Sequence, residues 1–222
     1  KYLLCILVLS FSSLSVFADW SDNFDNSTAQ QDWEIVNTGD NSTYNVQNNR
    51  FELYTERNSG SDRTLVSYVD ASESDYIMQT RIQKINSGDN FLAYLLARGN
   101  TSNMNAYVCG TSSEGTHLWF GKLTGGVYSN LTSTGPTLSY NPDDYQIRFA
   151  VFGDTLAAKV WSTSETEPVD WQLKYHDDSY TGGVGGIMLA TYSTLSWDEV
   201  RVAFDDVSLS VISKSNIWFQ CF

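Results

Sequence analysis

Residues 145 to 161 contain the sequence feature that most constrains the fold, a run in which apolar and polar side chains alternate strictly. The first half of the run places one apolar set on a single side of an extended strand: Tyr145, Ile147, Phe149 and Val151. Gly153-Asp154 then supplies a tight reversal. A second apolar set follows on the returning strand: Leu156, Ala158 and Val160. The segment therefore predicts an antiparallel hairpin with one buried face.

The rest of the chain repeats this pattern in short runs, and no long helical periodicity interrupts them. Only three prolines occur, whereas 15 glycines and many Asn and Ser residues separate the runs as turns would. This organisation is typical of an all-β, two-sheet antiparallel sandwich. We expect strands near these ranges: 44–54, 63–69, 75–85, 90–98, 104–109, 116–123, 126–131, 145–152, 155–161, 184–191 and 200–211.

Residues 1–18 are typical of a secretory signal peptide. Lys1 gives a positive start, an apolar stretch follows, and Val16-Phe17-Ala18 offers a small-residue cleavage site. The alternative, a membrane anchor, needs roughly 20 apolar residues and a basic flank, which this segment does not have. We therefore expect a secreted protein with one domain at 19–213, because a sandwich can reach roughly 200 to 250 residues, and a short tail at 214–222.

The charge of the chain argues against two classes of partner. Without Lys1 the chain has 12 basic against 26 acidic side chains, a net charge of −14. Such a chain repels phosphate backbones and anionic lipid headgroups, so we expect neither nucleic acid binding nor membrane insertion. The same excess suits solubility alone, or an extracellular protein that meets divalent cations.

Two features bear on chemistry in the secretory pathway. Cys5 leaves with the leader, so the mature chain keeps Cys109 and Cys221, which can form a disulfide if their Cα atoms lie within about 7 Å. Four N-glycosylation sequons also occur in polar, turn-rich segments. They begin at Asn26, Asn41, Asn100 and Asn130.

The two ends of the expected domain contain segments in a familiar order. The chain opens with Asp19-Trp-Ser-Asp-Asn-Phe-Asp25, followed by Trp33 and a turn before Arg50, and it closes with Gly182-Gly-Val-Gly-Gly186 and Phe204-Asp-Asp-Val207. In this order the segments resemble the first and last strands of the concanavalin A-like lectin/glucanase superfamily of laminin-G-like jelly rolls, except that Asn49 replaces the usual glycine of the turn. The resemblance covers residues 20 to 211 and implies a concanavalin A-like jelly-roll sandwich.

Strand parity separates side chains that point into such a sandwich from those that point outward. In 91–98 and 116–122 the inward set is clearly apolar, and the same reading of 105–109 places Ala106 and Val108 inside. Applied also to 77–83, it leaves one outward set: Arg81, Tyr94, Arg98, Tyr107, His117 and Trp119.

If those strands are neighbours, the six side chains form a binding face for sugar. Aromatic rings stack on the apolar side of a pyranose, and arginine makes forked hydrogen bonds to hydroxyls or carboxylates. The family resemblance implies the same, because one sheet of these jelly rolls commonly holds a saccharide on its concave side. Aromatic residues also favour strands for packing reasons alone.

The resemblance further implies a calcium ion. In laminarinase- and lichenase-type members an Asp on the last strand and backbone carbonyls near the first strand share that ion, and Asp205 matches the position of that Asp. Asp22 and Asp25 supply oxygen ligands at the other end, as calcium requires. The alternative is that Asp205-Asp206 marks a β-bulge, because Phe204 and Val207 both suit the core.

Catalytic patterns are weaker. Retaining glycosidases of this fold have the pattern E-x-D-x-x-E, whose nearest match here, Glu73-Ser-Asp75-Tyr-Ile-Met78, has Met in place of the acid. A polysaccharide lyase would need a base beside a group that neutralises a uronate, for which the candidates are His117, Tyr107, Arg98 and Gln79.

We therefore expect a secreted, lectin-like module that binds carbohydrate or a glycoconjugate, rather than an enzyme. Two alternatives stay open: an enzyme that degrades a polysaccharide, and an adhesion or coat protein that uses protein contacts. A fold by itself does not choose among them.

Overall fold

A computed structural model describes the domain as two packed β-sheets. It describes these residues: 20–25, 33–37, 42–55, 63–68, 74–86, 91–111, 114–135, 137–191 and 200–212. The predicted leader at 1–18 and the tail at 214–222 lie outside them. Among the described residues, no helix has the length and apolar character that crossing a membrane requires.

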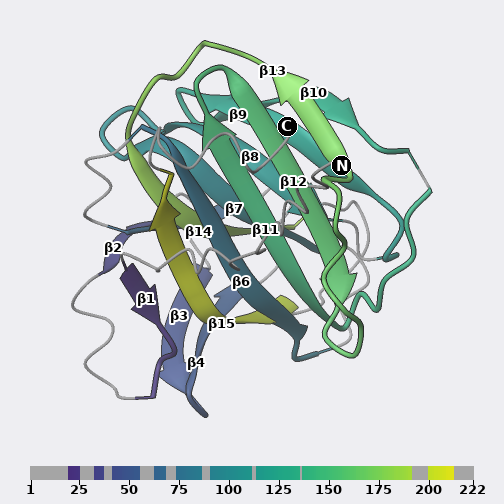
Figure 1. The fold of residues 1–222 in the computed structure, drawn as a ribbon. Helices are drawn as coiled ribbons and strands as arrows, with labels where there is room; N and C mark the ends of the chain where they lie inside the picture. The colour runs from purple at the N-terminus through teal and green to yellow at the C-terminus, as the bar shows by residue number, and fades with distance from the viewer. Residues whose placement is uncertain are drawn as a thin grey trace, which may run out of the picture.

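In the described part of the chain, fifteen strands form the two sheets, and all of their pairings are antiparallel (Figure 1). The eight-stranded sheet has the order β13 (Leu173–His176), β12 (Thr155–Ser162), β11 (Asp144–Phe152), β6 (Tyr76–Lys84), β15 (Val200–Val211), β4 (Arg50–Thr55) and β3 (Ser42–Gln47), with β1 (Trp20–Asp22) also on β15. The seven-stranded sheet has the order β10 (Val127–Ser133), β9 (Leu118–Thr124), β8 (Asn105–Thr111), β7 (Phe91–Asn100), β14 (Val184–Thr191), β5 (Arg63–Tyr68) and β2 (Trp33–Asn37). These two sheets confirm the predicted antiparallel jelly-roll sandwich.

The main core lies between the sheets and follows the alternation of the strands. The predicted hairpin of β11 and β12 is confirmed, with Tyr145 opposite Ser162 and a turn at Gly153, whose φ is +54°. Its apolar set is buried against the other sheet, and Phe149 stacks on Phe120 of β9 with ring centroids 5.4 Å apart. Burial of such side chains stabilises by about 1.5–3 kcal/mol each.

The outer face of the seven-stranded sheet is apolar as well. A second cluster packs there, separate from the core: Tyr94, Leu96, Ala106, Val108, Leu123, Met188 and Ala190, with Val36, Leu92, Trp119 and Tyr128 against it. The central strands of this sheet are therefore apolar on both sides, which removes the alternation on which parity depends.

Candidate functional site

The six side chains predicted to share one face do not do so. Arg81 lies on the outer face of the eight-stranded sheet, Tyr107 lies in the core between the sheets, and Arg98 is buried among loops. Tyr94 and Trp119 lie together on the outer face of the seven-stranded sheet, and His117 directly precedes β9. The prediction of a common face is therefore wrong for Arg81, Arg98 and Tyr107.

The error at Tyr107 is a parity error in β8. Tyr107 and Cys109 point into the core, and Ala106 and Val108 point outward, the reverse of the prediction. Because all four are buried, their apolar character does not distinguish the two sides. The Tyr107 hydroxyl donates to the carboxylate of Asp177 at 2.7 Å and accepts from the Tyr180 N–H at 3.0 Å. Such partners at the edge of the core let a tyrosine point inward.

Asp177 joins β8 to the loop that follows β13. Burial opposes its ionisation, but hydrogen bonds from Ser179 and Tyr107 outweigh burial and lower the pKa of Asp177 to about 2. Lys122 adds an ion pair, with its Nζ 3.4 Å from the carboxylate. These contacts fix the 177–180 loop against the seven-stranded sheet.

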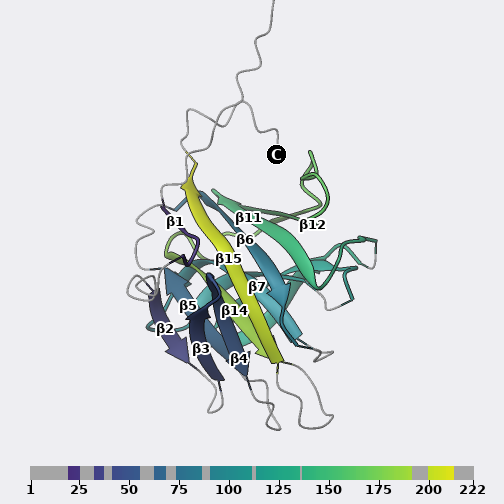
Figure 2. The ribbon, with the colours of Figure 1, turned by 90° about the horizontal axis from the view of Figure 1, so that it is seen from below.

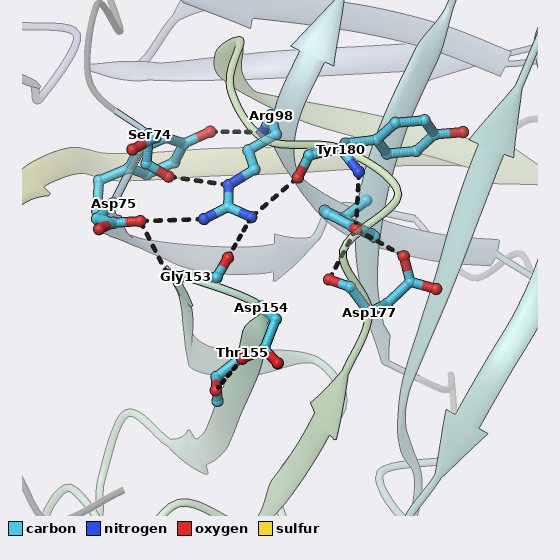
Figure 3. Close-up of polar contacts among 10 residues, drawn as sticks. Ser74, Asp75, Arg98, Gly153, Asp154, Thr155, Asp177 and Tyr180 are labelled. Atoms are coloured by element: carbon cyan, nitrogen blue, oxygen red, sulfur yellow. Dashed lines mark hydrogen bonds and ion pairs between the residues drawn. The ribbon is translucent and has the colours of Figure 1, made fainter.

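Arg98 is a structural clamp rather than a surface residue. Its guanidinium donates to the carbonyls of Ser74 (2.9 Å), Gly153 (2.7 Å) and Tyr180 (2.9 Å), and it pairs with Asp75 at 3.1 Å (Figure 3). The side chain is 1% exposed. Ser74 and Asp75 precede β6 and Gly153 joins β11 to β12, all in the eight-stranded sheet, whereas Arg98 lies on β7 of the other sheet. One side chain therefore ties the two sheets and the loop after β13 together at one end of the sandwich.

A bulge at the end of β7 redirects Arg98 into this position. Its φ is +51°, and the pairing of β7 with β8 shifts register between Ala97 and Asn100. Bulges re-aim side chains in this way. Gly183, with φ +136°, packs against the bulge, where an added Cβ would lie 2.7 Å from the carbonyl carbon of Arg98.

Arg81 belongs to a charge-matched polar face on the eight-stranded sheet. Its Nε and Nη2 each donate at 2.8 Å to the Asp144 carboxylate, which raises the pKa of Arg81 and lowers that of Asp144. Arg148 is similarly held by Gln79 and Glu167. Arg81 is thus separated from Trp119 by the thickness of the sandwich.

The outer face of the seven-stranded sheet brings together an aromatic platform, which we define as Tyr94, Trp119 and Tyr128. Register places Tyr94, Gly110 and Trp119 directly opposite one another on β7, β8 and β9. The Tyr94 ring centroid lies 6.4 Å from that of Trp119 and 6.4 Å from that of Tyr128. The three rings therefore form one aromatic cluster, with the Tyr94 ring between the other two.

Two glycines form the floor of the platform. A Cβ on Gly110 would lie 2.5 Å from Trp119 Nε1 and from Tyr94 Cε1, and one on Gly121 would lie 2.7 Å from Tyr128 Cζ. Glycine in a strand interior permits such close approach, so the rings can lie across the sheet. The sequence prediction missed Gly110, Gly121 and Tyr128. The available signals were an isolated glycine inside the predicted strand 116–123, Gly121, and another directly after the predicted strand 104–109, Gly110.

Polar groups border the platform on the edge strand β10. Ser133 pairs with Trp119 and Asn130 pairs with Gly121, and both residues are exposed. Trp119 and Tyr128 are partly exposed, whereas Tyr94 is buried beneath them. The face therefore presents two accessible rings beside amide and hydroxyl groups.

Only some of the cysteines and sequon asparagines named from the sequence lie among the described residues. Cys109 is a free thiol, fully buried in the core, and burial raises its pKa; Cys221 lies outside the described residues. Asn100 and Asn130 are exposed, as a glycan site requires, and their occupancy stays a prediction. Asn26 and Asn41 lie outside the described residues.

The predicted calcium ligands lie where β1 pairs with β15. Asp22 uses its two carboxylate oxygens to accept hydrogen bonds from the Phe24 N–H and from Trp33 Nε1, so it is a poor ligand. Burial raises the pKa of Asp205, and the charges of Asp206 and Asp25 raise it further. Within the described ranges, no group of three or more Asp, Glu, His or Cys side chains is arranged to hold a metal ion. The side chains present do not form a ligand set by themselves.

The bulge predicted as the alternative is present. The pairing of β15 with β6 shifts register between Asp205 and Ser208, Asp206 has φ +50°, and Phe204 and Val207 are both in the core.

The catalytic sets considered from the sequence are not assembled. Met78 is buried in the core, and Asp75 pairs with Arg98, so these two positions of the glycosidase-like segment are structural, while Glu73 lies outside the described residues. The lyase candidates are dispersed as well, because Tyr107 is inside and Gln79 is on the other sheet from His117.

Comparison with known proteins identifies the fold. No protein family and no curated protein matches the sequence of the chain. Among solved structures, a prokaryotic β-1,3-1,4-glucanase (lichenase) from a mouse hindgut metagenome has a TM-score of 0.62 at 14% identity, covering 88% of this chain and 100% of that one. The carbohydrate-binding module CBM66 from Bacillus subtilis has a TM-score of 0.59 at 18% identity, covering 81% and 95%. The exoplasmic/lumenal domain of VIP36 bound to Ca²⁺ and Man3GlcNAc has a TM-score of 0.55 at 10% identity, covering 83% and 85%. All three are concanavalin A-like jelly rolls, which is the fold of this chain.

Proposed function

We propose that the domain binds carbohydrate through the aromatic platform on the outer face of the seven-stranded sheet. The observation that supports it is the row in which Tyr94 and Trp119 lie over Gly110, with the Tyr128 ring over Gly121. Two partly exposed rings offer the stacking surface that the C–H side of a pyranose needs. Asn130 and Ser133 supply hydrogen-bond groups at the rim. Similarity in fold to a carbohydrate-binding module and a lectin domain is consistent with this role.

We expect Trp119→Ala to weaken binding by at least about tenfold, or about 1.4 kcal/mol, because aromatic anchors dominate such sites. A glycan array identifies the ligand, and calorimetry on the best glycan measures the affinity of each variant. Trp171→Ala is the matched control, since Trp171 is a partly buried tryptophan on the outer face of the other sheet. Equal affinity in both variants would remove the platform from consideration.

The same glycan separates binding from cleavage. Incubation with the intact protein followed by assay for new reducing ends or unsaturated sugars tests the alternative that the domain is an enzyme. Retention of the glycan without products supports a lectin-like module, and secretion from a eukaryotic host with the leader attached tests the proposed extracellular location.

We also propose that a calcium ion stabilises the pairing of β1 with β15, using Asp205, Asp25 and backbone carbonyls. The excess negative charge around Asp205 and the Ca²⁺-bound state of the VIP36 domain support this idea. After chelation, calcium at about a hundred times its Kd should add about 2.7 kcal/mol and raise Tm by several degrees. Asp205→Asn should abolish that shift. The exposed Asp178→Asn is the control, and a calcium shift of the same size in both variants would contradict the proposal.

A further inference from the structure

A groove of about 460 Å³ lies on the other side of the molecule, at the β3, β4 and β15 edge of the eight-stranded sheet. Its lining consists of Thr43, Tyr44, Asn45, Gln47, Glu52, Tyr54 and Arg201. Most of these side chains come from two rows across the three strands. Arg201, Tyr54 and Thr43 form one row, and Ala203, Glu52 and Asn45 form the next.

The floor of the groove is a fixed carboxylate. Glu52 is only 3% exposed, yet it accepts hydrogen bonds from Gln47 Nε2 at 2.5 Å and from Arg50 Nε at 3.0 Å. Arg201 Nη1 lies 3.9 Å from its second oxygen. A carboxylate held by several donors cannot turn away, so its orientation is set before any ligand arrives.

One wall of the groove is aromatic and equally restrained. The guanidinium of Arg201 lies 5.4 Å over the Tyr54 ring. The Tyr44 ring points to the other side of β3, where it stacks on the core residue Phe51, so it is not a wall of the groove. A preorganised ring beside convergent polar groups is the composition of a small-molecule site, and the volume is within the usual range of about 300–1,000 Å³.

We propose that this groove is a second binding site, for one unit of a neutral saccharide. Sugar hydroxyls donate and accept at the same time, which matches a lining that places the Thr43 hydroxyl and the Asn45 and Gln47 amides beside the Arg201 guanidinium. The buried Glu52 carboxylate holds Gln47 and Arg201 in place behind them. An anionic sugar would meet the Glu52 carboxylate on the floor and the field of a chain of net charge −13.

The two sites would give one domain two binding faces that point in opposite directions, since they lie on the outer faces of different sheets. Such a domain bridges two glycan chains without forming a dimer. The groove proposal is independent of the aromatic platform, because the two share no residue.

Titration of the Trp119→Ala protein, in which the platform is disabled, tests the groove directly. The probes are five sugars: glucose, galactose, mannose, N-acetylglucosamine and glucuronate. Ligand-observed NMR detects their binding at sugar concentrations up to about 50 mM, because a site for a single sugar unit binds weakly. We expect saturable binding of at least one neutral sugar. Addition of Thr43→Val or Asn45→Ala should weaken this binding by about tenfold.

Both groove substitutions lie on the edge strand β3 at exposed positions, so folding should persist, and circular dichroism checks it. Thr132→Val, a change on the edge strand of the other sheet, is the matched control. Three results would overturn the proposal: no saturable neutral probe, binding that the β3 changes leave intact, or a groove-dependent preference for glucuronate. If Trp119→Ala loses binding on the glycan array but still binds the neutral sugar in the NMR titration, the result supports both the platform and the groove.

Discussion

Replacing Arg98 by methionine should lower the free energy of unfolding by about 3–5 kcal/mol. The substitution removes every donor that the guanidinium supplies, so the carbonyls of Ser74, Gly153 and Tyr180 lose a partner whose side chain is only 1% exposed. Asp75 also loses its ion pair. An unsatisfied buried polar group costs about 1–3 kcal/mol, and several are created together.

Chemical denaturation of wild type and variant at neutral pH measures this loss. Arg81→Met is the matched control, because Arg81 also makes a two-bond pair with a carboxylate, but at a partly exposed position. Exposed pairs contribute up to about 1 kcal/mol, so the control should change little. Similar decreases in the free energy of unfolding of the two variants would show that the buried position of Arg98 does not increase its contribution to stability.

Gly183→Ala should lower the free energy of unfolding by at least about 2 kcal/mol. The φ of +136° disfavours any side chain, and the new Cβ would contact the carbonyl oxygen of Gly99 and lie 2.9 Å from that of Arg98. Backbone atoms cannot yield as a flexible side chain can, so the bulge that aims Arg98 has to move.

The neighbouring glycine provides a control one residue away. A Cβ on Gly182 would meet nothing within 4 Å, so Gly182→Ala should change the free energy of unfolding by no more than about 0.5 kcal/mol. Thermal and urea unfolding of the two variants give the comparison. If both alanines are tolerated equally, the close packing of Gly183 on the Arg98 bulge is not required for stability.

Local alternation predicted the fold well where one side of a strand is polar. The β11–β12 hairpin and the inward set of β6 were assigned correctly, because polar residues such as Arg148 and Gln79 lie on the outer face of that sheet. The bulge near Asp205 could also be predicted from the sequence, because Phe204 and Val207 are three positions apart and both are apolar enough to pack in the core. Sequence signals of this kind are local.

The candidate site was predicted only in part, for three physical reasons. Parity fails in β8, where both sides of the strand are apolar, so Tyr107 was assigned to the wrong side. Parity also fails at a bulge, which turned Arg98 inward. Finally, alternation gives the side of a strand but not the sheet that it joins, which is why Arg81 was grouped with Trp119.

The position of β15 governs the order in which the molecule can be completed. This strand, drawn in yellow in Figure 2, lies between β6 and β4 and also pairs with β1, while β14 lies between β7 and β5 in the other sheet. Both β14 and β15 are synthesised last, so β1 to β5 cannot join the remaining strands of their sheets until residues 184–211 have left the ribosome. Pairing across such long stretches of chain is slow. We expect a nascent polypeptide of this kind to expose unpaired strand edges until residues 184–211 emerge, and to need chaperones for longer than a protein whose strands pair in sequence order.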